Sequence, residues 1–485
     1  MAKTLKRQTL EGIGWRGSVD ITEQILQIVF TAILARLLTK ADFGLVAMAL
    51  LVNRFFTTVT NVGFGGAIIR SQNVTQRQIS AVFFIQLGLN IILSITVFLI
   101  AGAAANFFNE IKLTEIIKVT AWIILLQTFQ FPNILLQKDM DFKRFSIMEI
   151  SSMVIANLAA IILALTGFGY WALVGRLLLQ RAVFSATTWY VTRWRPVKPD
   201  FRGIKPLMTF GLNMLGSHIV YFFSENLIGI LTGKFLDKET MGLFNIAYNL
   251  AIVPATKIQG ILTTVLMPGF AKIQDDIKSF YKNNKKALLF TSLIFIPFMF
   301  LMAGISNNLI ITLYGFKWAD AGFMLFLLSF VGIMRGLAHL LRSSLLAKGQ
   351  ANVIFYSTIA EISASIPVMY FLMKPLGIYG LIAGYITGSL FGLSLIVYNY
   401  NKMFVEKGLF YKTVSKPFYI GIALLFISYS ISFIPLHHTL VLIMQVLFAS
   451  LIFVACIKLL YSDLYKENKE RLKTFLYTRG NNKML

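Results

Sequence analysis

Fourteen apolar runs, most of them near the length needed to cross a bilayer, constrain this chain more than any other feature. A hydrocarbon core about 30 Å thick is crossed by about 20 helical residues. Lipid offers no partner to an open backbone, so these runs must be helices, and their lengths and glycine or proline breaks exclude barrel strands. We place the spans at 11–36, 42–68, 79–104, 115–137, 146–166, 169–191, 206–232, 241–270, 287–304, 319–341, 352–373, 378–399, 415–434 and 439–459.

Composition supports a membrane protein and argues against other classes. Hydrophobic residues make up 57% of the 485 residues and the mean hydropathy is +0.72, whereas soluble domains are about 45–50% apolar. The net charge of +24 would suggest nucleic acid in a soluble protein, but here the basic residues stand at the ends of apolar runs. We therefore expect no nucleic-acid partner. A single cysteine, Cys456, excludes a disulfide framework or a cysteine metal cluster.

The distribution of lysine and arginine predicts the orientation. With the N-terminus inside, inner segments carry roughly four times as many basic residues as outer loops, as the positive-inside rule requires. The basic segment 193–205 then lies in the cytoplasm, and so do both chain ends. Because charged residues interrupt the first span, we expect no cleavage of a secretory signal there. The sequence thus predicts a multi-pass protein of the bacterial plasma (inner) membrane.

An internal repeat divides the chain. Residues 36–49 read RLLTKADFGLVAMA and residues 234–247 read KFLDKETMGLFNIA, with identical leucine, lysine, glycine and alanine positions. Six spans separate the copies, and an even number keeps them parallel, related by an axis along the membrane normal. Paired halves of this kind enclose a central site near the midplane and rock around it.

The repeat sets the expected domains. We predict an N-terminal six-helix lobe at 1–192, a cytoplasmic linker at 193–205 and a C-terminal six-helix lobe at 206–400. The last two helices and a basic cytoplasmic tail occupy 401–485. The fold class is therefore all-α and polytopic, with about 14 transmembrane helices in two pseudo-symmetric six-helix bundles around a central cavity, plus two C-terminal helices.

Carboxylates inside the membrane are the first candidate site residues. Span 1 carries Asp20 and Glu23, and span 7 carries Glu225 at the position equivalent to Gln27 of span 1. An ionisable group within the bilayer is costly and marks a functional site by default. We interpret the two polar stripes as facing one cavity, with helix–helix contact as the alternative. Asp20, Glu23 and Glu225 are candidates for coupling H⁺ or Na⁺, or for pairing with nearby cations.

Basic residues inside the spans form the second candidate set. A guanidinium facing lipid has no compensation, so these side chains should face the protein interior. There they pair with the carboxylates or bind an anionic substrate, since arginine grips phosphate bidentately and lysine binds it as a point charge. The candidates are Arg54 and Lys257, on equivalent spans of the two halves, together with Arg16, Arg176, Arg181 and Arg335.

Other polar residues and missing motifs narrow the function. Glu149 and Glu361 follow basic loops near the inner ends of their spans, where structural ion pairs are expected, and His218 aligns with Asp20 in the repeat. The sequence has no GxxxxGK[ST] loop for ATP and no HExxH or GxSxG motif. We therefore expect a transporter without a cofactor, and not an enzyme.

The segment GLFNIAYNLAIVPATKIQGILTTVLMPGFAKIQDD at 242–276 resembles the Wzx-type polysaccharide exporters, related to the colanic acid and teichuronic acid exporters. These belong to the multidrug/oligosaccharidyl-lipid/polysaccharide flippase superfamily. Further resemblance lies in TAILARLLTKADFGLVAMAL at 31–50, LLQKDMDFKRFSIMEI at 135–150 and SNNLIITLYGFKW at 306–318. Similarity is spread from about residue 8 to 460, and the 242–276 block is the most specific part.

The resemblance implies two six-helix bundles around a V-shaped cavity, with two helices appended. It also implies that a polyprenyl-diphosphate-linked oligosaccharide is carried from the cytoplasmic to the periplasmic leaflet. The implied partners are this lipid, membrane lipids, H⁺ or Na⁺, and polysaccharide polymerase machinery. Cavity cations of related flippases match Arg16, Arg54 and Lys257 by helix and depth, and only Lys257 lies in a recognisable motif, VPATKIQ.

Two alternatives stay open at this point. A cation-coupled multidrug exporter of the same superfamily would prefer an acidic cavity, whereas the groups inside these spans are mostly basic. A membrane glycosyltransferase or ligase acting on the same lipid would usually present carboxylates in extended outer loops, and the longest outer loop expected here, around 305–318, has none.

The span count generates a direct prediction. Single cysteines placed at positions 168 and 436, in a chain lacking Cys456, should react with a membrane-impermeant thiol reagent added outside the cell. Cysteines at positions 197 and 280 should react only after the membrane is opened. Labelling of position 197 from outside would overturn the count, because one missed or false span reverses every later loop.

Overall fold

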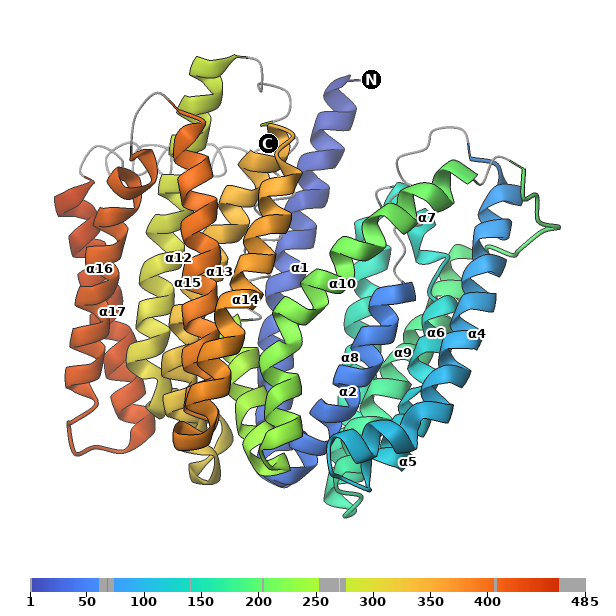
Figure 1. Cartoon of the computed structure of the whole chain (residues 1–485), viewed down its shortest axis with the longest axis horizontal. Coiled ribbons are helices and arrows are strands. Elements are labelled where there is room, and N and C mark those ends of the chain that lie inside the picture. Colours follow the sequence, from blue (N-terminus) through green and yellow to red (C-terminus); the bar gives the residue numbers. More distant parts are fainter. Residues whose placement is uncertain are drawn as a thin grey trace, which may run out of the picture. The chain divides into compact units, whose positions relative to one another are not determined.

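The computed structural model describes residues 2–60, 68, 74–139, 141–202, 205–252, 270, 276–404 and 408–461. Every regular element within these ranges is helical, which confirms the predicted all-α class. Nine of the described helices are long and apolar enough to cross a membrane. The chain is therefore a multi-pass membrane protein, and the described parts of the predicted spans are largely helical, with a break in the span at 115–137 (Figure 1).

The described helices have the following bounds. The first group is α1 (Ala2–Leu37), α2 (Lys40–Thr60), α4 (Gln76–Phe107), α5 (Leu113–Thr120), α6 (Trp122–Thr128), α7 (Asn133–Lys138), α8 (Phe142–Leu165), α9 (Tyr170–Thr192) and α10 (Lys205–Phe235). A further helical stretch begins at 238 and is described to 252. The second group is α12 (Ile277–Tyr314), the 3₁₀ turn η1 (Phe316–Trp318), α13 (Ala321–Ala347), α14 (Ala351–Leu376), α15 (Ile378–Lys402), α16 (Leu409–Ile431) and α17 (His438–Leu460).

The chain divides into two compact units. Unit 1 comprises Met1–Asn249, Leu313–Trp318 and Phe355–Gly392, and unit 2 comprises Leu250–Thr312, Ala319–Ile354 and Leu393–Leu485. The units follow packing, whereas the lobes expected at 1–192 and 206–400 follow the sequence repeat. The two-lobe division therefore stays a prediction.

Hydrogen-bonded polar side chains help to join the helices of unit 1. In this unit α8 packs against α1 and α9, and α2 packs against α5 and α10. The buried Asn53 amide of α2 donates to the Thr120 hydroxyl of α5 at 2.8 Å. Asn90 of α4 donates to Thr128 of α6 at 2.7 Å. Such bonds between membrane helices replace the hydrophobic drive that lipid removes.

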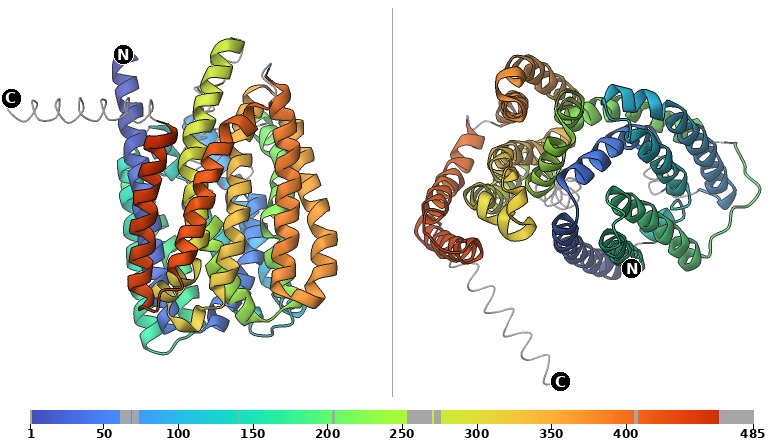
Figure 2. Two further views of the ribbon diagram at one scale, coloured as in Figure 1. Left: turned by 90° about the vertical axis from the view of Figure 1, so that its left-hand side faces the viewer. Right: turned by 90° about the horizontal axis from the view of Figure 1, so that it is seen from below.

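Unit 2 carries the two helices that lie outside the repeat. Figure 1 shows α16 and α17 as an antiparallel pair, and the views in Figure 2 also place them side by side. The fully buried Gln445 of α17 donates to the Ser428 carbonyl of α16 at 2.6 Å and accepts from Asn308 of α12 at 3.2 Å. A buried amide thus ties the appended pair to the body of unit 2.

The predicted span at 115–137 differs from the structure, because it is not one helix. It consists of α5, α6 and α7, with a break at Ala121 and turns between Thr128 and Asn133. Pro132 has no N–H to donate, which weakens the helical ladder there. Two carbonyls at the break find partners on α9: the Trp189 indole donates to the Phe129 carbonyl at 2.6 Å, and Ser185 donates at 3.1 Å to the Leu126 carbonyl, which also accepts from the Phe129 N–H. Irregular backbone is tolerated in a membrane where protein groups satisfy it.

The two copies of the repeat meet within unit 1. A Cβ added to Gly44 would lie 1.7 Å from the Lys238 carbonyl oxygen, and one added to Gly242 would lie 2.1 Å from the Lys40 carbonyl oxygen. Lys40 is equivalent to Lys238, and Gly44 to Gly242, so the contact is reciprocal. This is the geometry of two equivalent helix starts crossing about a two-fold axis. Only glycine lets the two backbones approach so closely.

This crossing generates the second prediction. Gly44→Ala should lower the midpoint of thermal unfolding in detergent and the amount of protein in the membrane, because the new methyl group meets a backbone oxygen. Overpacking of this kind typically costs about 1–3 kcal/mol. The matched control is Gly88→Ala in α4, where nothing lies within 4 Å of the added Cβ. A Gly44→Ala protein as stable as the Gly88→Ala protein would contradict the crossing.

Candidate functional site

Arg54 is the predicted cation that the structure leaves most available. It lies on α2, one position from the buried Asn53, and its side chain is exposed. Among the described residues, nothing forms an ion pair or hydrogen bond with its guanidinium, whereas its backbone carbonyl accepts from Thr57 and Thr58. The guanidinium is therefore accessible within a membrane helix, where an unpaired charge is costly.

Arg176 and Arg181 lie on α9 in different surroundings. The Nε of Arg176 is buried and has no hydrogen-bond partner among the described residues. Arg181 donates from Nη1 to the Gln130 side-chain oxygen at 3.0 Å, and Glu149 of α8 is near enough to favour its charge. The structure thus brings Arg181, Gln130 and Glu149 together beside the break between α6 and α7.

The structure says less about the three other predicted cations. Lys257 lies outside the described residues, and Arg16 is on α1 with its side chain outside what is described. Arg335 is 6% exposed on α13, within unit 2. The structure places Arg54, Arg176 and Arg181 in unit 1, and no described contact joins Arg54 to the other two.

The predicted carboxylates are all partly buried. Asp20 and Glu23 lie on α1, where one oxygen of each is shielded from solvent. Gln27, on the same helix face, donates to Thr31 at 3.3 Å. Glu225 of α10 accepts from the Tyr248 hydroxyl at 3.2 Å. All three carboxylates are thus partly shielded from solvent, and their role in ion coupling stays a prediction.

The weaker sequence candidates have mainly structural surroundings. Glu361 is 6% exposed between α14 and α15, accepts from Ser389 at 3.4 Å and faces Gly392. Glu149 of α8 lies close enough to Arg181 of α9 for an electrostatic attraction between the two charges. His218 is half-buried on α10. No group of three metal-ligating side chains occurs in the part of the chain that the structure describes.

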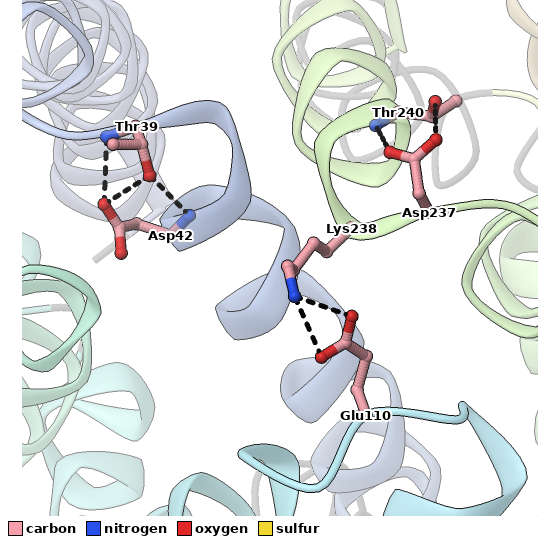
Figure 3. Close-up of polar contacts among 6 residues, drawn as sticks. All are labelled: Thr39, Asp42, Glu110, Asp237, Lys238 and Thr240. Atoms are coloured by element: carbon pink, nitrogen blue, oxygen red, sulfur yellow. Dashed lines mark hydrogen bonds and ion pairs between the residues drawn. The ribbon is translucent and has the colours of Figure 1, made fainter.

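Sequence analysis missed a polar cluster at the predicted outer end of the repeat (Figure 3). In the first copy, the Asp42 carboxylate accepts from the Thr39 hydroxyl at 2.6 Å and the Thr39 N–H at 2.9 Å. In the second copy, Asp237 accepts from the Thr240 N–H at 2.8 Å and hydroxyl at 2.9 Å. The signal was present in the sequence as T-x-x-D and D-x-x-T at equivalent positions, which are capping pairs with the residues exchanged.

The surroundings of Asp237 favour its charged form. Burial works against the charge, but the hydrogen bonds that Thr240 donates outweigh it and lower the pKa of the Asp237 carboxyl. Because the charged carboxylate stands at a helix start, it also meets the positive end of the helix dipole. The cap therefore holds the helix start at Lys238 in place.

Two segments close over the equivalent helix ends at the predicted outer side. Lys238 forms an ion pair with Glu110, which follows α4, at 2.9 and 3.2 Å (Figure 3). On the other copy, Lys317 donates to the carbonyls of Arg36 and Leu38 at 3.0 and 2.7 Å. Burial lowers the pKa of Lys317, and the attraction of Asp42 opposes that shift. Nothing in the sequence linked Glu110 to Lys238, because the two are far apart along the chain.

Comparison with known proteins relates the chain to polysaccharide biosynthesis. Residues 33–323 match the family described as polysaccharide biosynthesis protein. The chain is 25% identical to the lipopolysaccharide biosynthesis protein WzxC of Escherichia coli (strain K12), over 89% of each chain. It is 27% identical to the teichuronic acid biosynthesis protein TuaB of Bacillus subtilis (strain 168), over 97% of this chain and 98% of that one.

Among solved structures, the fold resembles that of the lipid II flippase MurJ in an inward closed conformation. The TM-score is 0.74 at 15% sequence identity, over 93% of this chain and 99% of that one. An identity this low relates the two folds only. It places the chain among polytopic helical transporter folds.

The third prediction concerns the broken span. Trp189→Phe removes the N–H that satisfies the Phe129 carbonyl while keeping an aromatic ring, so stability should fall by about 0.5–1.5 kcal/mol. Trp122→Phe is the matched control, since Trp122 is 57% exposed and donates to no other described residue. Thermal unfolding in detergent measures both. Equal losses in the two variants would contradict a supporting role for Trp189.

Proposed function

This chain belongs to the polysaccharide biosynthesis protein family, and from that membership we propose that it moves a polyprenyl-diphosphate-linked oligosaccharide repeat unit across the membrane. The movement runs from the cytoplasmic to the periplasmic leaflet and supplies polysaccharide biosynthesis. No bond is made or broken, so the protein is a transporter. The relatives named above match 89% and 97% of the chain, and both are described as biosynthesis proteins for surface polysaccharides or related polymers.

One observation carries the chemistry of this proposal. Arg54 holds a permanent positive charge within a membrane helix, exposed and without a partner among the described residues. A diphosphate carries the negative charge that such a group attracts, and arginine binds phosphate through two parallel hydrogen bonds. Lys257, on the equivalent span of the second half, would approach the same diphosphate from the opposite side. Its role rests on sequence, because it lies outside the described residues.

The remaining site residues support the same function in different ways. Arg176 and Arg16 would extend the cationic path, whereas Arg181 is engaged with Gln130 and Glu149 and would act on the glycan side of the substrate. Arg335 is included among the proposed substrate-binding residues on the evidence of the sequence alone. Asp20, Glu23 and Glu225 would carry H⁺ or Na⁺. Transport assays with and without each ion gradient, on Asn and Gln variants, test that assignment.

The mechanism follows from where the charges lie. The diphosphate enters a cationic cavity while the polyprenyl tail stays in lipid, and the two halves rock to expose the cavity to each side in turn. We place the chain in the bacterial plasma membrane with both ends in the cytoplasm, where lipid-linked units are made. A multidrug exporter would need acidic groups for cationic drugs, and the available group here is basic.

The fourth prediction tests the diphosphate contact. Arg54→Ala and Lys257→Ala should each reduce export strongly, because losing one charge-assisted contact costs about 1.5–3 kcal/mol, roughly ten- to hundredfold in binding. Arg54→Lys should retain part of the activity, since the charge survives without the bidentate fork. The measurement is accumulation of lipid-linked oligosaccharide on the inner leaflet, beside the membrane level of each variant.

The control and the contrary outcome are clear. Lys143→Ala removes an exposed charge near the start of α8 and should leave export unchanged. If Arg54 and Lys257 instead stabilise the fold through ion pairs, each replacement should lower the membrane level of the protein. Removing the carboxylate partner as well should restore that level. Normal export by a stable Arg54→Ala/Lys257→Ala double variant would contradict the proposed diphosphate contact.

A further inference from the structure

The outer ends of the two repeat copies are covered by exchanged segments. The segment after α4, in the first half, lies over the second copy: the Phe108 ring comes within 2.9 Å of a Cβ built on Gly233, and Glu110 pairs with Lys238. The segment around η1, in the second half, lies over the first copy, where the Trp318 indole donates to the Ala35 carbonyl at 2.9 Å. Ala35 and Gly233 are equivalent positions, so each half covers the helix end of the other.

The two covers differ in strength. Trp318 is fully buried, its ring meets Phe43 edge-on at 5.4 Å, and the neighbouring Lys317 binds two carbonyl oxygens at the end of α1. Its segment, Leu313–Trp318, belongs to unit 1, although the chain on both sides of it belongs to unit 2. This corner is therefore fixed to the first copy by a buried ring and backbone hydrogen bonds.

The other cover depends on a partly exposed ion pair. The side chains of Lys238 and Glu110 are 36% and 22% exposed, and their ion pair joins the segment to the start of the second copy's helix. The Phe108 ring of the same segment is buried beside Gly233, but a phenyl ring donates no hydrogen bond to hold it there. Partly exposed ion pairs contribute little to stability and weaken with salt, whereas a buried indole with a satisfied N–H contributes much more. If the outer face opens, this contact separates first.

We propose that Lys238 and Glu110 form a releasable latch on the outer face, and that the Trp318 corner, with the Gly44–Gly242 crossing, is the fixed pivot. The inference rests on the proposed transport function, because a transporter must open its outer side to release the substrate. Release then requires the ion pair to separate and the Phe108 ring to leave Gly233, while the glycine crossing holds the two helix starts together. The opening is asymmetric, because the Glu110 segment moves and the Trp318 segment stays in place.

The fifth prediction uses two cysteine pairs in a Cys456→Ser background. The latch pair is Glu110→Cys with Lys238→Cys, and the pivot pair is Arg36→Cys with Lys317→Cys. A short bifunctional thiosulfonate joins each pair, and a reductant separates it again. Cross-linking the latch pair should stop export until the reductant is added, whereas cross-linking the pivot pair should leave export unchanged.

A second readout separates the latch from the function. A cysteine replacing Tyr221, which is exposed on α10, is labelled from outside with an impermeant maleimide, without any substrate present. Glu110→Gln should raise the labelling rate, and the charge exchange Glu110→Lys with Lys238→Glu should return it towards the original rate. If labelling follows the latch but no glycan lipid is exported, the latch stands and the proposed function fails. If the cross-linked latch pair still exports, or if both pairs block export equally, the latch is wrong.

Discussion

A peptide group inside a bilayer finds no hydrogen-bond partner in lipid, and the whole structure of this chain follows from that constraint. Every described element is helical for this reason, and the span at 115–137, which breaks within the described chain, is supported by its neighbour. Trp189 of α9 donates to the Phe129 carbonyl beside Pro132, and Ser185 donates to the Leu126 carbonyl one turn earlier. Trp189 and Ser185 stand one turn apart, and Arg181 precedes them by another, so one face of α9 serves the whole break.

Permanently charged side chains are also poorly solvated by lipid, and fewer neighbouring groups can compensate them. Arg181 is accommodated by a neutral amide oxygen and a nearby carboxylate, which is a structural answer to a charge in a membrane helix. Arg54 has no such answer among the described residues, although keeping a guanidinium in a membrane helix is costly. Under the proposed function, the diphosphate of the substrate compensates this charge during transport.

How much the sequence could predict depends on the range of the interaction. Span positions and the outer helix starts were predictable, because hydropathy and capping act over a few neighbouring residues. The break near Pro132 was not, since Pro297, Pro367 and Pro417 lie inside unbroken helices and proline alone does not decide. The pairing of Arg181 with Gln130 also depends on helices that meet only in the folded chain.

Comparison of the two repeat copies shows which residues are required by backbone packing and which can differ between the copies. Gly44 and Gly242 are identical because no other residue lets the two backbones touch, and that identity made the repeat visible in the sequence. The caps require only one hydroxyl and one carboxylate, so their order is exchanged between the copies without loss. The covers require only that an end be closed, and one copy is closed by a buried indole with a satisfied N–H, the other by a buried phenyl ring and a partly exposed ion pair. Two halves built on one plan thus acquire unequal contacts at the predicted outer end, and under the proposed latch this inequality gives the fold a preferred side on which to open.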